Sequence, residues 1–213
     1  MKLEDLVNFL TKRLKEPLPG WESQIKMAPK LRNPDSYKLP DKLKAKVGGV
    51  LIFLYNFEKT PYVLLMKRPD YQGVHSGQVS FPGGKKEDSD RNIIETAIRE
   101  FSEETGVSKS NLTIIGSLSE LYIPASNFYI YPTIAYSTQR PEMKPDKKEV
   151  AYLLEIKVRD LINDNLVKDK KITAVKNFEL IAPCIEINNE IIWGATAMVI
   201  SEFKTILQEL RLS

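Results

Sequence analysis

Three glutamates, Glu100, Glu103 and Glu104, stand at positions i, i+3 and i+4 of one short segment. On a helix this spacing places the three carboxylates on one face, within reach of one another. Like charges so close repel, and a bound divalent cation removes the repulsion because oxygen ligands converge on it. Taken alone, a glutamate-rich stretch is more often a solvated helix face, so the metal-site hypothesis depends on what surrounds it.

Arg99 stands four residues before Glu103, so the two side chains can pair across one helical turn. The arginine would orient the Glu103 carboxylate and hold it ionised, which makes Glu103 a candidate catalytic base as well as a metal ligand. Glu149 is a second candidate base from outside the helix. A surface residue that follows Lys147 and Lys148 is the plainer interpretation of Glu149.

A glycine pair precedes the glutamates, in the run Phe81-Pro82-Gly83-Gly84. Two consecutive glycines permit positive φ and close backbone approach, so their main chain can face a metal or a phosphate directly. On its own this run is more often an ordinary turn, but beside a carboxylate cluster it indicates a cradle for a metal-bound phosphate. Arg68 is a candidate phosphate contact because a guanidinium binds phosphate in a bidentate way. A surface arginine at the end of a strand is an equally good interpretation.

The elements that must position these residues alternate between strands and helices. The carboxylate segment is predicted to be a helix over 92–105, with Ser89 or Asp90 as its N-cap and Gly106 after its last turn. Apolar periodicity predicts two more helices and seven strands: helices at 1–16 and 196–210, and strands at 47–55, 62–66, 112–118, 129–137, 150–157, 178–181 and 191–193. Residues 21–46 are expected to be an irregular connection, and the lysine-rich run 168–171 a turn. This alternation predicts a mixed α/β domain.

The composition is that of an ordinary globular protein. Of the 213 residues, 42% are hydrophobic and 28% are charged, which excludes a disordered chain, a collagen and a coiled coil. No apolar run approaches the roughly 18–20 residues of a membrane span, and the amphipathic N-terminus resembles neither a secretory signal nor a transit peptide. The formal net charge of +3 is only mildly basic and does not by itself indicate nucleic-acid binding, so we expect neither a membrane nor a nucleic-acid partner.

The chain contains a single cysteine, Cys184, and a single histidine, His75. These numbers exclude cysteine-rich zinc sites and multi-histidine metal sites. Carboxylates must therefore hold any bound metal, which favours a hard cation, Mg²⁺ or Mn²⁺. A lone cysteine cannot form an intramolecular disulfide and fits a reducing compartment, so a cytoplasmic location is expected.

The stretch from Gly84 to Val107 resembles the Nudix box, the signature of the Nudix hydrolase family. The second half of that box reads arginine, glutamate, apolar, any residue, two glutamates, any residue, glycine, apolar, and residues 99–107 match it at every defined position. The first half departs from the pattern. Arg91 stands where the box has a glutamate, and the spacer is one residue longer. The replacement acid is left open among three residues: Glu87, Asp88 and Asp90.

The segment before the box is similar to the coenzyme A pyrophosphatase branch of this family. Arg68, Gly77 and the run 81–84 match that branch, whereas Met66 replaces a threonine and Gly73 replaces a second arginine. Pro183, the run 192–197 and the Glu-Val pair at 149–150 also resemble this branch. The resemblance covers residues 46–207.

This resemblance implies an α/β fold, the Nudix α/β/α sandwich around a mixed β-sheet. It divides the chain into a Nudix domain over residues 46–213 and an N-terminal helix and irregular extension over residues 1–45, packed on that domain. It also implies metal-dependent hydrolysis of a diphosphate bond in coenzyme A or acyl-coenzyme A, giving 3′,5′-ADP and (acyl-)4′-phosphopantetheine. Another nucleoside diphosphate derivative, such as ADP-ribose or NADH, is the first alternative. A non-catalytic nucleotide-binding module is the second, and the three retained glutamates argue against it.

These considerations assign candidate roles to individual residues. The expected metal ligands for Mg²⁺ or Mn²⁺ are Glu100, Glu103 and Glu104, and the expected catalytic residues are Arg99, Glu103 and Glu149. The expected substrate contacts are Arg68, His75, Gly77, Phe81, Gly83 and Gly84. Phe81 and Trp193 are candidates to stack on adenine or to pack in the core, and the core is favoured for Trp193. The expected partner is a small-molecule nucleotide diphosphate, bound by a monomer or a homodimer.

Overall fold

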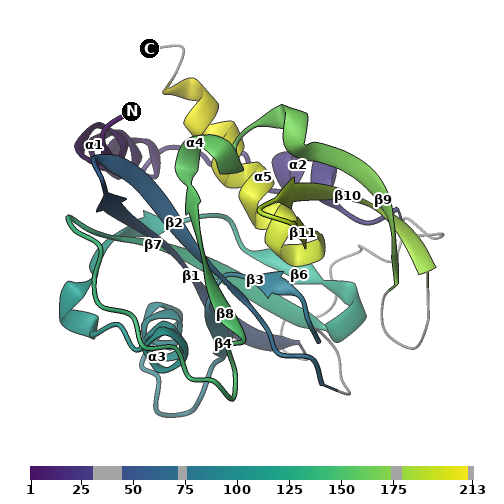
Figure 1. The fold of residues 1–213 in the computed structure, drawn as a ribbon, viewed down its shortest axis with the longest axis horizontal. Helices are drawn as coiled ribbons and strands as arrows, with labels where there is room; N and C mark the ends of the chain where they lie inside the picture. The colour runs from purple at the N-terminus through teal and green to yellow at the C-terminus, as the bar shows by residue number, and fades with distance from the viewer. Residues whose placement is uncertain (31–44, 72–75, 174–178, 211–213) are drawn as a thin grey trace.

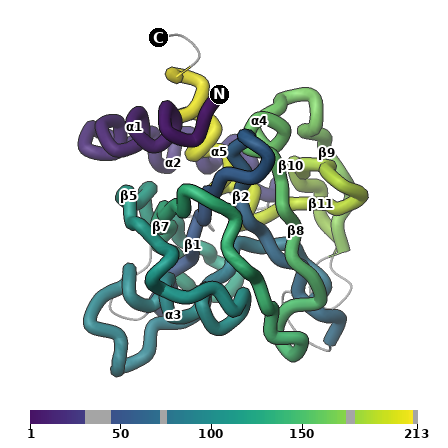
Figure 2. The backbone as a smooth tube through the Cα atoms, turned by 60° about the vertical axis from the view of Figure 1, so that its left-hand side comes forward, coloured from purple at the N-terminus to yellow at the C-terminus, as the bar shows by residue number. Residues whose placement is uncertain are grey.

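The computed structural model describes residues 1–30, 45–71, 76–173 and 179–210. In this part of the chain a large β-sheet lies between α3 on one side and α1, α4 and α5 on the other (Figure 1). A view turned by 60° shows the same layers, with α1 and α5 above the sheet and α3 below it (Figure 2). None of the helices described combines the length and the apolar composition needed to cross a membrane.

The large sheet mixes parallel and antiparallel pairing. Strand β1 pairs in parallel with β7 and in antiparallel fashion with β2 and β4, and β8 lies against the other edge of β2. Its eight strands are β1 Lys46–Phe57, β2 Thr60–Lys67, β3 Val79–Ser80, β4 Gly83–Lys85, β5 Thr113–Ser117, β6 Leu121–Ile123, β7 Phe128–Ser137 and β8 Tyr152–Lys157. The predicted mixed sheet is therefore confirmed.

A second, antiparallel sheet comprises β9 Val167–Thr173, β10 Glu179–Ile187 and β11 Glu190–Ile192. The prediction of a turn at 168–171 is wrong, because these lysines lie in β9. Cross-strand pairing explains the strand: Lys168 Nζ is 3.0 Å from a Glu186 carboxylate oxygen, and Lys170 contacts the same carboxylate on β10. Pairing with an acid on the neighbouring strand offsets the low strand propensity of lysine.

The helices cover both faces of the main sheet. They are α1 Leu3–Arg13, α2 Trp21–Gln24, α3 Ile93–Thr105, α4 Val158–Leu161 and α5 Gly194–Glu209, with short 3₁₀ turns η1 Ile25–Met27, η4 Lys109–Asn111, η5 Pro124–Ser126 and η6 Asp164–Leu166. The irregular connection expected over 21–46 therefore contains α2 and η1. The remainder of it, residues 31–44, lies outside the described residues.

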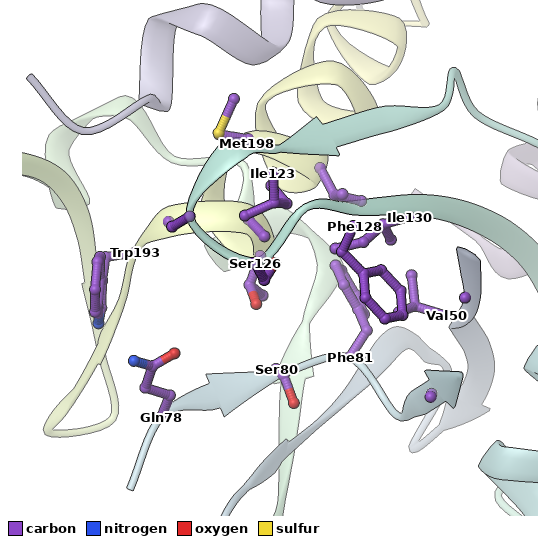
Figure 3. A pocket seen from close by; sticks show the side chains of 18 of the residues that line it. Val50, Gln78, Ser80, Phe81, Ile123, Ser126, Phe128, Ile130, Trp193 and Met198 are labelled. Atoms are coloured by element: carbon purple, nitrogen blue, oxygen red, sulfur yellow. The ribbon is translucent and has the colours of Figure 1, made fainter. Parts of the chain in front are cut away.

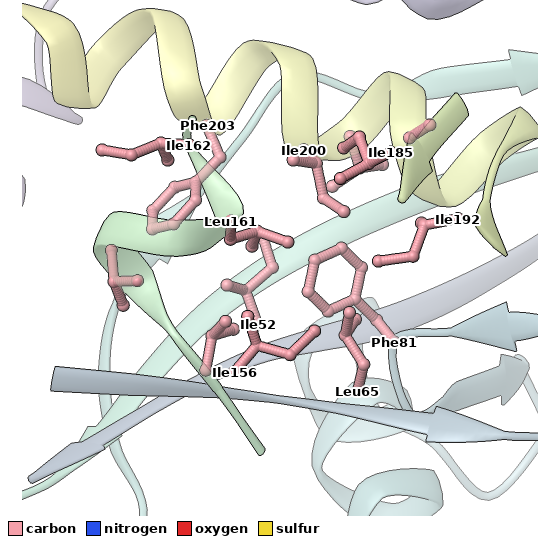
Figure 4. Packing of buried hydrophobic residues seen from close by; sticks show 14 of the residues in the cluster. Ile52, Leu65, Phe81, Ile156, Leu161, Ile162, Ile185, Ile192, Ile200 and Phe203 are labelled. Carbon is pink, nitrogen blue, oxygen red and sulfur yellow. The ribbon is translucent and has the colours of Figure 1, made fainter. Parts of the chain in front are cut away.

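Strand β1 is buried on both faces and separates two hydrophobic cores. Leu51, Phe53 and Tyr55 face α3, where the Phe53 and Phe101 rings lie 5.0 Å apart. Ile52 and Leu54 belong to the larger core on the α5 side, and Figure 4 shows Ile52 there among apolar side chains from α5, α4, β8 and β11. Because successive side chains of a strand point to opposite faces, this burial produces the predicted three-layer sandwich.

Helix α3 begins and ends through side-chain and backbone caps. The predicted N-caps, Ser89 and Asp90, are wrong: Asn92 caps the helix, and its side-chain oxygen accepts a hydrogen bond from the Glu95 amide at 3.0 Å. Gly106 follows the last turn at φ 71°, in the left-handed conformation that glycine adopts without strain.

The helix packs closely on β1 at Gly49. A Cβ at position 49 would lie 2.6 Å from the Ile93 carbonyl oxygen and 2.9 Å from the Ala97 amide nitrogen. Only glycine permits this approach of strand and helix, because both contacts are main-chain atoms of α3 that cannot move aside.

The N-terminal segment is fastened to α5 by polar contacts. Glu202 is fully buried, and its carboxylate accepts hydrogen bonds from Gly20 N at 3.1 Å, Ser119 N at 3.2 Å and Gln24 Nε2 at 2.8 Å. Ser201 Oγ donates to the Ser23 carbonyl oxygen at 2.6 Å. The segment up to residue 30 thus packs on α5, while the domain boundary at residue 46 stays a prediction.

We expect Glu202→Ala to destabilise the fold, because the half-buried amides of Gly20 and Ser119 lose their acceptor and the buried Gln24 side chain loses its shortest one. The free energy of unfolding should fall by about 2 kcal/mol or more, and the melting temperature by about 4–8 °C. Glu202→Gln keeps one acceptor oxygen for Gly20 N and Ser119 N, so it should cost less than half as much. Urea unfolding of the two variants checks this, and equal losses in both would contradict it.

Candidate active site

A depression of about 300 Å³ lies beside the last two turns of α3. Side chains and main chain from four parts of the fold meet in it: the end of β2, the glycine pair of β4, helix α3, and the loop before β8. The residues that line it are Arg68, Pro69, Tyr71, Gly83, Gly84, Glu100, Glu104, Lys148 and Glu149. Three carboxylates and two cationic side chains therefore share one small site.

Glu104 is the buried acid of this depression. Only 1% of its surface is exposed, and its Oε2 accepts a hydrogen bond of 2.7 Å from the Gly83 amide. Burial raises the pKa of the carboxyl to about 8, because the attraction of Arg68, 3.7 Å away, offsets only part of the desolvation cost. The carboxylates of Glu100 and Glu149 add repulsion that acts in the same direction.

Glu100 lies against the glycine pair. A Cβ at position 84 would overlap the Glu100 carboxylate, so the absence of a side chain at Gly84 creates the space that this carboxylate fills. Burial raises the pKa of Glu100, although the Arg99 guanidinium, 2.8 Å away, opposes that shift.

Arg99 is the centre of a network that fixes the acids. Its Nε and Nη2 each donate to the buried Asp90 carboxylate at 2.9 Å, and its Nη1 donates to Glu100 at 2.8 Å and to Glu103 at 3.1 Å. These hydrogen bonds hold the pKa of Asp90 well below its usual range and raise that of Arg99. Arg99 thus offsets part of the repulsion among the glutamates, so that repulsion does not by itself require a cation.

Glu87, Asp88 and Asp90 are the three acids that could replace the missing glutamate of the box. Of these, Asp90 is the one that pairs closely with Arg99. It also accepts hydrogen bonds from the Glu87 amide at 2.9 Å and from the Thr96 hydroxyl at 3.0 Å, so it joins the loop to the helix. Glu87 is only a distant partner of Arg99, 3.9 Å away, and its side chain is 63% exposed. Asp90 is therefore a positioning residue with all its oxygens engaged.

Glu103 is placed differently from the other two helix glutamates. Its side chain is 58% exposed, it pairs with Arg99, and it does not line the depression. The structure instead brings Glu149 to Glu100 and Glu104. The metal-ligand and base roles of Glu103 stay predictions.

Glu149 reaches the depression because its loop is anchored to the end of α3 by the main chain. Lys144 N donates to the Thr105 carbonyl oxygen at 2.8 Å, and Asp146 N donates to that of Glu104 at 3.1 Å. The Glu149 amide then closes a turn onto the Asp146 carbonyl oxygen at 3.1 Å. This anchoring brings the second half of the loop back to the carboxylates of α3.

The predicted substrate contacts fall into two groups. Arg68, Gly83 and Gly84 line the depression, and Phe81 lines a larger cavity next to it. Gly77 lines neither space; it forms a turn at φ 60°, in which a Cβ would clash with the Asp70 carboxylate oxygen at 2.5 Å. His75 lies outside the described residues.

The larger cavity has a volume of about 450 Å³ and a mostly apolar lining (Figure 3). Trp193 lies on its wall and is partly exposed, so the prediction that this ring packs in the core is wrong. The ring stands just before α5, where the chain is extended rather than helical, and this places it at the edge of the domain.

Sequence reasoning missed Lys148 and Tyr71 as lining residues of the depression. Lys148 looked like part of a solvated basic pair, and only the anchoring of its loop to α3 brings it to the carboxylates. Its position next to Glu149 was the available signal. Tyr71 carried no signal, because it follows a strand in a segment without periodicity.

The donor set fits a hard divalent cation in its chemistry. Glu100, Glu104 and Glu149 offer carboxylate oxygens, the ligands that Mg²⁺ and Mn²⁺ prefer, and the cradle at Gly84 leaves the Glu100 carboxylate unobstructed. Within the described ranges no three acidic, histidine or cysteine side chains already converge closely enough to form a complete coordination set. Binding therefore requires rotation of the side chains, which the exposed loop position of Glu149 allows.

Comparisons with known proteins agree on the family. A model of the NUDIX domain matches residues 45–182, well over half of the chain. The chain is 31% identical over 141 residues to the uncharacterized Nudix hydrolase NudL of Yersinia pestis (strain Pestoides F), covering 66% of this chain and 69% of that protein. It is 38% identical over 97 residues to NudL of Pectobacterium atrosepticum, a match that spans 46% of this chain and only half of that protein.

Among solved structures, the chain resembles a MutT/nudix family protein from Enterococcus faecalis with a TM-score of 0.52. The identity is 15%, and the match covers 80% of this chain and 65% of that one. At this identity the similarity concerns the fold alone.

The raised pKa of Glu104 predicts how the metal-free protein responds to pH. The folded state holds a proton on this carboxyl up to about pH 8, whereas the unfolded state loses it near the ordinary value of 4.5. The free energy of unfolding should therefore fall as pH rises between these values, and Glu104→Gln should remove that part of the slope. Thermal unfolding in EDTA from pH 5 to pH 8 checks this; parallel curves for the two proteins would exclude a buried, protonated Glu104.

The two glycines beside α3 should respond differently to alanine. In Gly84→Ala the new Cβ meets only the end of the flexible Glu100 side chain, so the fold survives while the carboxylate leaves the depression. We expect diphosphatase activity to fall about 10–100-fold with little change in melting temperature. Gly49→Ala is the matched variant, and its Cβ meets main-chain atoms of α3, so stability should fall first. A fully active Gly84→Ala protein would show that the position of the Glu100 carboxylate does not matter for activity.

Proposed function

The chain belongs to the Nudix hydrolase family, and from that membership we propose that it is a metal-dependent diphosphatase acting on coenzyme A or an acyl-coenzyme A. The reaction would break the diphosphate bond with water and release 3′,5′-ADP and (acyl-)4′-phosphopantetheine. The observation that carries the proposal is the depression at Gly83 and Gly84, in which three carboxylates face two cationic side chains.

Different residues of the depression would bind the metal ion and the phosphates of the substrate. Glu100, Glu104 and Glu149 would hold Mg²⁺ or Mn²⁺, and the bound cation offsets phosphate charge, polarises phosphorus and acidifies water. Arg68 and Lys148 stand at the same site and bind the phosphoryl oxygens, which carry the charge that repels a nucleophile. The glycine pair lets the carboxylates of Glu100 and Glu104 lie directly against the main chain of β4, so that they share one small site with Arg68 and Lys148.

Position favours Glu149 over Glu103 as the base that accepts the proton of the attacking water. Glu149 lines the depression from an exposed loop, whereas the Glu103 carboxylate is turned away to Arg99. Arg99 acts through its partners: with Asp90 behind it, it holds Glu100 in place and is a positioning residue. The buried Glu104 is fixed by the Gly83 amide.

The choice of substrate is supported by the sequence before the box. Arg68 and the run 81–84, which match the coenzyme A pyrophosphatase branch, lie at the depression or at the cavity beside it. Gly73, which replaces the second arginine of that branch, lies outside the described residues and keeps ADP-ribose or NADH as the alternative substrate class. The retained carboxylates oppose a non-catalytic role, and the single cysteine supports a cytoplasmic location.

A substrate panel in ¹⁸O-labelled water with Mg²⁺ or Mn²⁺ tests the proposal. Mass spectrometry should find 3′,5′-ADP and 4′-phosphopantetheine from coenzyme A, with the label on the phosphorus that is attacked. Glu104→Gln should reduce kcat/KM by roughly 100-fold or more, since a bound metal supplies several kcal/mol of transition-state stabilisation.

Glu4→Gln, on the exposed face of α1, is the matched control and should keep full activity. Cleavage of ADP-ribose or NADH with coenzyme A left intact would replace the proposed substrate by the alternative. Equal activity of Glu104→Gln and the parent protein would contradict the proposal that these carboxylates form the active site.

A further inference from the structure

We propose that the apolar cavity beside the carboxylate depression binds the pantetheine arm of the substrate, together with the start of any acyl chain, while the nucleotide half lies outside it. This inference rests on the proposed function and specifies how the substrate is oriented. The arm is uncharged and consists of methyl and methylene groups, one hydroxyl, two amides and a thiol or thioester, whereas the nucleotide half carries a purine and a 3′-phosphate. The lining of the cavity discriminates between these two chemistries.

The cavity joins the depression at its glycine corner. Arg68, Gly83 and Gly84 line both spaces. The depression opens toward α3, and the cavity lies on the α5 side of the sheet, lined by Val50 of β1 and Met198 of α5. A phosphate held by Arg68, which lines both spaces, therefore places its ester oxygen at the mouth of the cavity, and the group attached there continues inward.

The walls come from three elements that face one another in Figure 3. Phe81 follows β3, and Ile123 and Phe128 belong to the β6–β7 hairpin. Trp193 immediately precedes α5, and Met198 lies within that helix. At about 450 Å³ the cavity falls within the range of small-molecule sites, which are lined mainly by apolar and aromatic groups. An uncharged arm of methyl and methylene groups gains from burial against such walls.

The positions of the cationic side chains disfavour binding of the nucleotide half inside the cavity. Among the described residues that line the cavity, the cationic ones are Arg68 and Lys85, both on the strand edge next to the diphosphate site. A 3′-phosphate deeper inside would lose its hydration without meeting a cation, which is costly. A purine would likewise bring several hydrogen-bonding atoms into a lining that is mainly apolar, where Val50, Ile123 and Met198 offer no side-chain partner and only a few polar side chains, such as Gln78, Ser126 and Thr196, are present.

The cavity does offer a polar contact for an amide. Ser80 Oγ is buried and has no hydrogen-bond partner in the described part of the chain, and Ser80 lines the cavity. A buried hydroxyl without a partner costs free energy, and an amide group of the arm would supply the missing hydrogen bond. Ser126, labelled on the opposite wall in Figure 3, is a second hydroxyl of the lining.

Part of the wall lies outside the residues that match the family model. Pro29 and the run from Trp193 to Val199 line the cavity, whereas the family match ends at residue 182 and begins at residue 45. The space is therefore closed by segments on both sides of the shared domain. Its apolar lining therefore comes partly from segments that the family model does not include.

Trp193 fluorescence tests the orientation directly. The chain has two tryptophans, so in a Trp21→Phe background Trp193 is the sole reporter. Titration with S-hexanoyl-4′-phosphopantetheine should change its emission saturably, and titration with 3′,5′-ADP should leave it unchanged while calorimetry detects any binding at the depression. Both probes carry phosphate, so the comparison isolates the group attached to it.

Ser126→Phe fills the cavity and should weaken binding of the hexanoyl probe about tenfold or more, with the same affinity for 3′,5′-ADP. Ser110→Phe, on the exposed turn η4, is the matched control and should bind both probes as the parent does. Ala195→Leu narrows the cavity from α5 and provides an independent variant if Ser126→Phe melts early.

The outcomes separate this inference from the proposed function. A saturable Trp193 response to 3′,5′-ADP, or no response to the hexanoyl probe, overturns the orientation even if coenzyme A is hydrolysed. A response to the hexanoyl probe that Ser126→Phe removes supports the cavity assignment, and it does so even if hydrolysis of coenzyme A is absent and the proposed function fails.

Discussion

The close approach of α3 to the edge of the sheet is the constraint on which the rest of the site depends. Gly49 removes the side chain that would otherwise hold the helix away from β1, and Gly84 leaves room for the Glu100 carboxylate beside β4. Only at this separation can the Gly83 amide donate to Glu104 and the Glu100 carboxylate lie over the glycine pair. The carboxylates are therefore positioned by main-chain contact between strand and helix.

The Arg99–Asp90 pair completes this constraint from the other side. It joins the loop that follows β4 to the middle of α3, and the same guanidinium orients Glu100. The buried charge of Asp90 is balanced by two hydrogen bonds from Arg99 and one each from a backbone amide and a hydroxyl. The loop between β4 and α3 is thus tied to the helix that bears the acids.

The sequence predicted the helix of acids, the glycine pair and most strands, because each of these has a local signal. Periodicity located β1, β2 and β7, and the box pattern located Arg99 and its neighbours. The short strands β3, β4 and β6 have two or three residues each, too few to show alternation, and they exist because longer strands pair with them.

The errors arose where tertiary contacts decide. Lysines of β9 form a strand because acids on β10 pair with them, and Trp193 lines a cavity because α5 begins at the edge of the domain. Glu103 and Glu104 are neighbours in sequence, and only the packing of α3 determines that one is exposed and the other buried. Spacing alone could place three acids on one face but could not choose among them.

The loop before β8 holds Glu149 near α3 chiefly through amide-to-carbonyl bonds, and the Asp146 side chain adds one more by accepting from the Lys148 amide at 2.9 Å. Because the backbone makes most of these contacts, substitution of the exposed side chains at positions 144 and 147 should cost the site little, whereas Asp146 also closes the turn through its carboxylate. The spacing between Glu149 and the acids of α3 therefore depends on the length and the backbone path of this loop more than on the identity of its exposed residues.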